Sequence, residues 1–162
     1  MLSDPAAEVS KTFRDAGMTV SAAESCTGGL ISHYLTGLPG ASAFFLAGVV
    51  AYSPEAKMRI LGVSPETIAR CGLVSNETAG EMAERIRDIT NSDYAVSSTG
   101  NLGPGVLEGK EKGLVYIAVS RKGRTETREL RLRGEREENK REAALSALAF
   151  LLESLEKDKG EG

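Results

Sequence analysis

Residues 19–29, TVSAAESCTGG, constrain the fold of this chain more than any other segment. A strand-like alternation runs into a Ser-Cys-Thr-Gly-Gly turn that opens a helix. Gly28 and Gly29 let the backbone approach a ligand closely, and the N–H groups at the start of the helix favour an anion or an oxyanion. Ser25 therefore lies where nucleophiles often lie. The alternative is that Ser25 or Thr27 only caps the helix.

A second segment, residues 48–57 (GVVAYSPEAK), supplies a candidate base. Its β-branched run ends at Tyr52, and a Ser-Pro turn starts a short helix that carries Lys57. A serine hydroxyl needs a base, and a lysine can serve if burial or a nearby cation lowers its pKa from about 10.4. Tyr52 could orient or relay the proton, whereas the single histidine, His33, falls inside the preceding helix and is expected on the surface. The alternative for Lys57 is a solvated helix face.

Six segments, in order along nearly the whole chain, resemble the C-terminal domain of the CinA family. They are AESCTGG at 23–29, LTGLPGASAFFLAGVVAYSPEAKMRILGV at 35–63, CGLVSNETAGEMAERI at 71–86, SSTGNLGPG at 97–105, GLVYIAV at 113–119 and GEREENKR at 134–141. A resemblance of this extent is more specific than any single motif. It implies one domain over residues 1–162, folded as a three-layer α/β/α sandwich with a mixed central sheet.

The resemblance also implies an activity, because stand-alone members of this family include nicotinamide-nucleotide amidohydrolases. These enzymes convert nicotinamide mononucleotide to nicotinate mononucleotide and ammonia, with no cofactor or metal implied. By position, the resemblance marks Ser25 as the nucleophile, Lys57 as the general base and Tyr52 as an assisting residue. The substrate-binding residues that it implies are Cys26, Thr27, Gly28, Gly29, Thr99, Gly100, Arg136 and Lys140.

The chain departs from the family pattern after Thr99. Family members read TGIAGP, a second glycine pair and a Lys-Pro, whereas residues 99–113 read TGNLGPGVLEGKEKG. Lys110 and Lys112 lie where a substrate could enter, so the substrate stays open. Lys140 stands where the family has a second arginine, and lysine offers phosphate a point charge without a bidentate fork. Either Arg136 or Lys140 could hold the phosphate.

Three alternatives remain on the sequence alone. Cys26, beside Ser25, is intrinsically a better nucleophile, unless its side chain points into the core as a small apolar residue. The domain could instead bind a pyridine nucleotide or a protein without turnover, if the altered loop after Thr99 has removed activity. A role in competence or the response to DNA damage follows only from the family name.

Charge and composition argue against direct nucleic-acid binding. The formal net charge is −3, whereas nucleic-acid-binding domains commonly carry a basic excess. Residues 121–142 hold nine Lys or Arg against six Glu, but no aromatic side chain is interleaved with them. The charged part of this segment is typical of an edge strand protected by charge.

The same composition indicates a cytoplasmic protein that needs no disulfide. The two cysteines, Cys26 and Cys71, show no zinc-ligand spacing, and no signal peptide or membrane segment is apparent. A nucleotide-sized small molecule is the expected partner. The leucine stripe on the last helix indicates either core packing or a subunit contact, and we expect a homo-oligomer.

Helical and strand-like patterns alternate along the chain, which favours a layered α/β domain with a sheet between helices. A first helix should begin at the Asp4-Pro5 pair and end at Gly17. The apolar run 44–52 predicts a central strand covered on both faces. The other predicted elements are strands at 18–23 and 94–98, a hairpin at 113–120 and 125–132, helices after Gly28 and at 54–61, 65–70, 76–90 and 135–155, and a frayed polar tail at 156–162.

Overall fold

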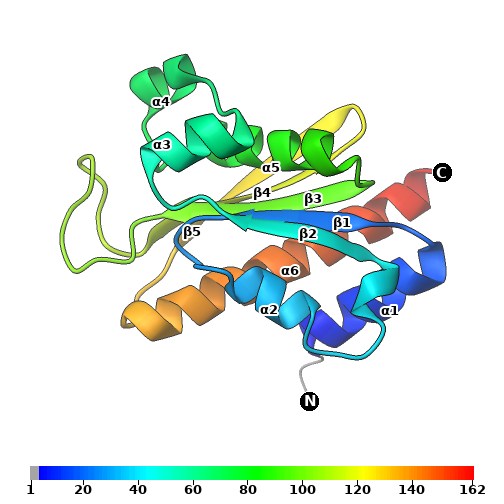
Figure 1. The fold of residues 1–162 in the computed structure, drawn as a ribbon. Helices are drawn as coiled ribbons and strands as arrows, with labels where there is room; N and C mark the ends of the chain where they lie inside the picture. The colour runs from blue at the N-terminus through cyan, green and yellow to red at the C-terminus, as the bar shows by residue number, and fades with distance from the viewer. Residues whose placement is uncertain (1–3) are drawn as a thin grey trace.

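A five-stranded mixed sheet in the order β2-β1-β3-β4-β5 forms the centre of the computed structural model, which describes residues 4–162 (Figure 1). β1 pairs in parallel with β2 and β3, and β4 pairs antiparallel with β3 and β5. The strands are β1 (Val20–Glu24), β2 (Phe45–Val50), β3 (Tyr94–Gly100), β4 (Leu114–Arg121) and β5 (Arg124–Arg131).

Helices cover both faces of this sheet, so the predicted three-layer α/β/α sandwich is confirmed (Figure 1). One face carries α1 (Pro5–Ala16), α2 (Leu30–Leu35) and the long α6 (Arg136–Glu161). The other carries α3 (Pro54–Ala56), the π-helical turn η2 (Lys57–Leu61), α4 (Pro65–Cys71) and α5 (Asn76–Thr90), and a short 3₁₀ turn, η1 (Ala41–Ala43), precedes β2.

Capping residues fix the helix ends where the sequence places them. The Asp4 carboxylate accepts a hydrogen bond from Ala6 N at 3.0 Å, and Gly17 ends α1 with a φ of 65°. The Ser75 hydroxyl likewise accepts from Thr78 N at 3.1 Å and starts α5. These local bonds satisfy N–H groups that a helix cannot satisfy internally, which explains why the predicted boundaries hold.

The prediction of a central strand at residues 44–52 is wrong. β2 lies at the edge of the sheet and is only partly covered, because alternate side chains face solvent along its length. Leu46 and Val50 are 46% and 47% exposed. A continuous apolar run is typical of a strand covered on both faces, but the run itself does not determine where the strand sits in the sheet.

The predicted charge-protected edge strand is confirmed as β5, which closes the other side of the sheet. β5 turns back from β4 through a tight hairpin and is almost wholly polar, with the sequence RTETRELR. The charges keep this edge from pairing with other strands. β3 and β4, in contrast, are buried along almost their full lengths and form the centre of the core.

The prediction of a frayed tail at residues 156–162 is wrong, because α6 continues to Glu161. Asp158 accepts a hydrogen bond from the Tyr94 hydroxyl at 2.6 Å and pairs with the Nε of Arg121. Arg121 also contacts Glu126 at 3.1 Å and is 6% exposed. Asp158 therefore anchors this segment to the end of the sheet, although the other residues of the segment are exposed to solvent.

We expect Asp158→Ala to lower the free energy of unfolding by about 1–3 kcal/mol, because it leaves the Tyr94 hydroxyl and the Arg121 guanidinium short of a buried partner. Urea denaturation monitored by circular dichroism measures the loss. Asp15→Ala is the matched control, since Asp15 pairs with Lys11 on an exposed helix surface and should cost less than about 0.5 kcal/mol. Equal effects of the two substitutions would contradict this account of the helix end.

Candidate active site

The turn between β1 and α2 is built around the carboxylate of Glu24, which is fully buried. Its Oε1 accepts hydrogen bonds from the Thr27 hydroxyl at 2.7 Å and from the backbone N–H groups of Gly29 and Ile31 at 3.1 and 2.9 Å. Its Oε2 accepts from the backbone and the hydroxyl of Ser32 at 2.9 and 2.7 Å. A buried carboxylate is stable only with such complete pairing.

Glu24 therefore occupies the start of α2, which differs from the expectation that this helix end faces a ligand. The N–H of Gly28 is also engaged, because it donates to Ser25 O at 3.0 Å. Gly29 adopts a φ of 102°, which a side chain would disfavour, so the turn needs glycine for its shape. Within residues 4–162, the N–H groups of Cys26 and Thr27 donate to no backbone or side-chain acceptor of another residue.

Lys57 reaches Ser25 from the opposite side of the strand end. Its Nζ lies 2.9 Å from Ser25 Oγ, and its side chain is 1% exposed. The same Nζ donates to the backbone carbonyls of Ala51 at 2.9 Å and Tyr52 at 3.0 Å. Lys57 opens the π-helical turn η2, a local irregularity that is frequent at functional sites.

The two carbonyl acceptors orient Lys57 for proton transfer. A neutral amine has two N–H donors and one lone pair. If Ala51 O and Tyr52 O take the two N–H groups, the lone pair is directed at Ser25 Oγ. Burial lowers the pKa of Lys57 from its ordinary value to about 8, so a neutral Lys57 is accessible near physiological pH. The pair can thus act as nucleophile and base.

A cavity of about 150 Å³ opens above Ser25 and Lys57. Cavities of this volume in other proteins hold a benzene-sized ring. Its walls come from the β1–α2 turn, the segment after β2, the α4–α5 linker, the end of β3 with the following loop, and the start of α6. The lining residues are Ser25, Cys26, Tyr52, Lys57, Leu73, Val74, Thr99, Gly100, Asn101, Leu102, Gly103, Leu107 and Arg136.

Tyr52 and Arg136 meet at the rim of this cavity. Arg136 donates to the Tyr52 hydroxyl at 3.1 Å and to Gly103 O at 2.9 Å. The Tyr52 side chain is 57% exposed, and it is the Tyr52 backbone carbonyl that contacts Lys57. Lys140 lies outside the cavity lining, with its ammonium against the Cα of Gly28. Of the two basic residues expected near the phosphate, only Arg136 borders the cavity.

The other predicted residues divide between the cavity and the interior. Thr99 borders the cavity but donates its hydroxyl to Leu73 O at 2.8 Å. Gly100 is required by close packing, because a Cβ there would lie 2.7 Å from Val115 Cγ2. Thr27 is fully buried and bonds to Ser98 and Glu24. Thr27, Gly28, Gly29 and Lys140 do not line the cavity.

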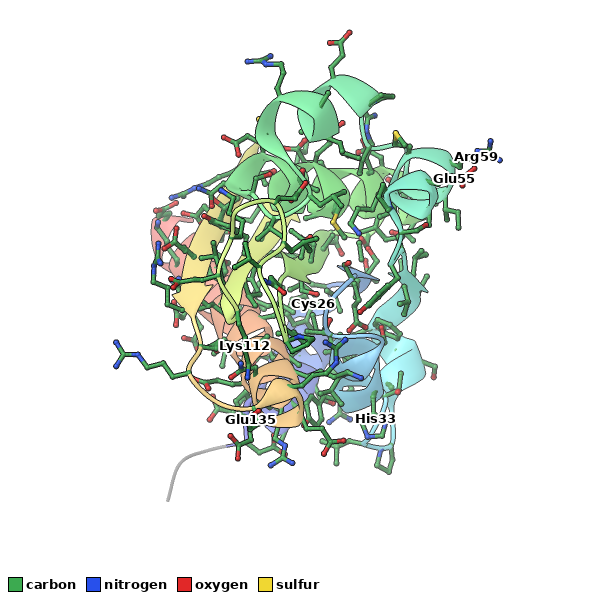
Figure 2. All side chains as sticks on the ribbon, turned by 90° about the vertical axis from the view of Figure 1, so that its left-hand side faces the viewer. Cys26, His33, Glu55, Arg59, Lys112 and Glu135 are labelled. Carbon is green, nitrogen blue, oxygen red and sulfur yellow. The ribbon has the colours of Figure 1, made fainter. Side chains whose placement is uncertain are left out.

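Cys26 borders the cavity but is 6% exposed. Burial raises the pKa of its thiol to about 12, so it stays a neutral thiol near pH 7 and is a weak nucleophile there. Figure 2 looks onto this end of the molecule, with Cys26 labelled near the middle and His33 below it. The prediction that His33 is a surface residue is confirmed.

Several residues of the site were not predicted from the sequence. Leu73 and Val74 form part of the cavity wall; they lie within the family-like segment 71–86, but in a stretch with no chemical motif. Glu24 lies in the family-like segment 23–29, but only the fold shows that its carboxylate organises the turn. The signal that could have identified Glu24 is a charged residue at the end of an otherwise small and apolar strand, because such a charge needs a buried partner.

Among residues 4–162, no group of three or more His, Cys, Asp or Glu side chains is arranged to hold a metal ion. No helix in the same range combines the length and the apolar character that crossing a membrane requires.

Solved structures with the same fold extend over nearly the whole chain. Competence damage-inducible protein A (ComA) of Klebsiella pneumoniae is 36% identical, with a TM-score of 0.91 over 93% of this chain and 94% of that one. A CinA superfamily protein of Klebsiella pneumoniae 700603 is 33% identical, with a TM-score of 0.92 over 94% of this chain and 96% of that one.

Longer relatives match along one part of their sequence. A protein of Acetivibrio thermocellus whose name refers to competence-damage induction is 46% identical over 151 residues, which are 93% of this chain and 37% of the relative. The chain thus spans little more than a third of the length of such relatives. The model of the CinA C-terminal domain matches residues 2–155, and the chain therefore belongs to the CinA C-terminal domain family.

Proposed function

We propose that this domain hydrolyses the carboxamide of nicotinamide mononucleotide to nicotinate mononucleotide and ammonia, with Ser25 as nucleophile and Lys57 as general base. The observation that carries the proposal is the 2.9 Å contact between Lys57 Nζ and Ser25 Oγ at the base of the cavity. The resemblance to nicotinamide-nucleotide amidohydrolases supplies the substrate. The cavity volume supports it, because it suits a pyridine ring and leaves the ribose phosphate to extend past the rim.

The reaction proceeds through two acyl-transfer steps. Neutral Lys57 takes the Ser25 proton while Ser25 Oγ attacks the carboxamide carbon. The resulting ammonium of Lys57 returns a proton to the leaving nitrogen, the C–N bond breaks and ammonia departs, leaving an ester on Ser25. Water then attacks this ester while Lys57 takes one of its protons. Lys57 returns that proton to Ser25 Oγ as the ester C–O bond breaks, and the nicotinic acid product loses its carboxyl proton to solvent and leaves as the carboxylate.

The Cys26 N–H is the donor best placed by sequence position to stabilise the oxyanion, because it directly follows the nucleophile. The neighbouring N–H groups of Ser25, Gly28 and Gly29 are committed to Ser98, Ser25 and Glu24. Their commitment narrows the donors of this turn to Cys26 and Thr27. In this proposal Cys26 stabilises the oxyanion through its backbone N–H, and its thiol takes no part.

Arg136 is the proposed phosphate ligand. It lies at the rim, where a ribose phosphate would emerge from the cavity, and its guanidinium can bind phosphate in a bidentate manner. Its present partners, Gly103 O and the Tyr52 hydroxyl, are both neutral. Its charge therefore remains available to an anion, and Tyr52 supports the position of the guanidinium.

Ammonia release from nicotinamide mononucleotide tests the proposal directly. Ser25→Ala should abolish activity, because no nucleophile remains, and Lys57→Ala should lower kcat/KM by about 100- to 10,000-fold. Cys26→Ala should stay within about five-fold of the intact protein, since a buried neutral thiol takes no part. Binding of the nucleotide without ammonia release by the intact protein would contradict the activity and favour a binding domain.

The pH dependence of kcat/KM should follow the protonation of Lys57. Its lowered pKa means that the reactive neutral amine forms above about pH 8 and is lost below it. Activity should therefore rise with pH and level off above this value. Initial rates between pH 6 and pH 10 measure the profile, with circular dichroism as a check on folding. A flat profile across this range would rule out Lys57 as the base.

Substitution of Arg136 should affect only substrates that carry the phosphate. Arg136→Ala should raise KM for nicotinamide mononucleotide by about ten-fold, the loss of one charge-assisted contact, and should leave nicotinamide riboside unaffected. Lys140→Ala is the matched control and should change KM by less than about three-fold, because Lys140 lies outside the cavity. An equal loss on both substrates would show that Arg136 shapes the rim without binding phosphate.

A further inference from the structure

Hydrogen bonds connect several of the segments that line the candidate cavity. Ser25 N donates to Ser98 O at 3.1 Å, and the Thr99 hydroxyl donates to Leu73 O at 2.8 Å, which joins the end of β3 to the α4–α5 linker. Lys57 Nζ donates to the Tyr52 carbonyl, and Arg136 donates to the Tyr52 hydroxyl and to Gly103 O. The loop after β3 contributes further residues to the lining.

Glu108, at the tip of this loop, binds the α4–α5 linker. Its Oε1 accepts from Leu73 N at 2.9 Å and Val74 N at 3.0 Å, and its Oε2 accepts from Leu73 N at 3.0 Å. In Figure 1 this loop is the yellow-green excursion at the left, and in Figure 2 it faces the viewer. The carboxylate therefore joins two chain segments that both contribute to the cavity lining.

The backbone at the loop tip indicates that the Glu108 side chain matters. Leu107 and Lys110 exchange backbone hydrogen bonds at 3.0 and 2.8 Å and enclose a two-residue turn. Glu108 and Gly109 occupy that turn with φ values of 53° and 72°. Turns with two positive φ values favour Asn, Asp or Gly in the first position. A glutamate there is unfavourable for the backbone, and its contacts with the linker compensate.

The loop supplies two apolar side chains to the cavity wall. Leu102 is 4% exposed and Leu107 is 43% exposed, and both border the cavity. Asn101 holds the loop together, because its side-chain amide donates to Gly105 O at 2.8 Å and Lys110 O at 3.0 Å. The loop is thus internally ordered, and the Glu108 carboxylate fixes its tip against the linker.

We propose that Glu108 is a positioning residue of the Ser25 site, which latches residues 101–112 to the Leu73–Val74 linker and holds Leu107 as the wall that contacts the substrate ring. This inference rests on the proposed function for its substrate. Glu108 lies in the segment where the chain departs from the family pattern, so the altered loop would have a role in shaping the cavity.

The charge of Glu108 also acts on Lys57. The titratable or charged groups that line the cavity with Lys57 are the Cys26 thiol from the β1–α2 turn, Tyr52 from the segment after β2 and Arg136 at the rim, and Glu108 acts on Lys57 through its charge from the loop. Glu108 is negative and raises the pKa of Lys57, against the larger effect of burial. Loss of this charge should shift the rise of the pH profile toward lower pH.

Three variants distinguish the effect of the Glu108 hydrogen bonds to the linker from the effect of its charge on Lys57. On the plateau of the pH profile, where Lys57 is neutral in both proteins, Glu108→Ala should raise KM for nicotinamide mononucleotide by about ten-fold while kcat changes by less than about two-fold, because the wall loses its anchor and the chemical groups remain. Glu108→Gln keeps an amide oxygen that accepts from both N–H groups, so KM should stay near that of the intact protein while the pH profile moves to lower pH. Glu111→Ala, in the same loop, is the control, because Glu111 pairs with Arg131 away from the cavity.

Hydrogen exchange of residues 101–112 provides a readout that does not require activity. Glu108→Ala should accelerate exchange across this segment, and Glu111→Ala should not. Unchanged exchange and unchanged KM in Glu108→Ala would overturn the proposal. If the intact protein releases no ammonia, the proposed function fails. The hydrogen exchange of Glu108→Ala compared with Glu111→Ala then decides by itself whether Glu108 holds residues 101–112 against the linker.

Discussion

The burial of the Lys57 ammonium beside Ser25 is the constraint on which the site depends. A buried lysine is costly unless its donors are satisfied or it loses its proton. Ala51 O and Tyr52 O satisfy two donors, and Ser25 Oγ lies where the third would point. These contacts satisfy the buried amine, and burial lowers its pKa to about 8, which suits the proposed role as a base near neutral pH.

A second buried charge holds the other half of the site. Glu24 neutralises the start of α2 and fixes the turn that presents Ser25, while its backbone carbonyl accepts from Ala51 N at 2.8 Å. Ala51 in turn holds Lys57 through its own carbonyl. The end of β1 thus positions both Ser25 and the Ala51 carbonyl that accepts from Lys57 Nζ, so the strand pairing supports the contact between Lys57 and Ser25.

Signals between neighbouring residues predicted most helix ends and strands of this fold. The features that the sequence did not predict depend on contacts between residues far apart in the chain. Asp4, Gly17 and Ser75 act through bonds to neighbouring residues, so the sequence places the helix ends correctly. The edge position of β2 and the helical end of α6 depend on partners far along the chain, such as Arg121 for Asp158. In the site, the turns that follow two predicted strands indicated that Ser25 and Lys57 could meet. The Leu73–Val74 wall and the Glu108 contact could be found only from the folded structure.

The central claim is that Lys57 is poised to be neutral beside Ser25, and an NMR titration of the lysine side chains tests it most directly. Protein labelled with ¹³C at the lysine Cε positions, with Lys57→Arg to assign the signal, gives the pKa of this one amine. The account predicts a value of about 8. A pKa of about 10.4, the ordinary value for lysine, would contradict it, because the amine would then be charged at neutral pH.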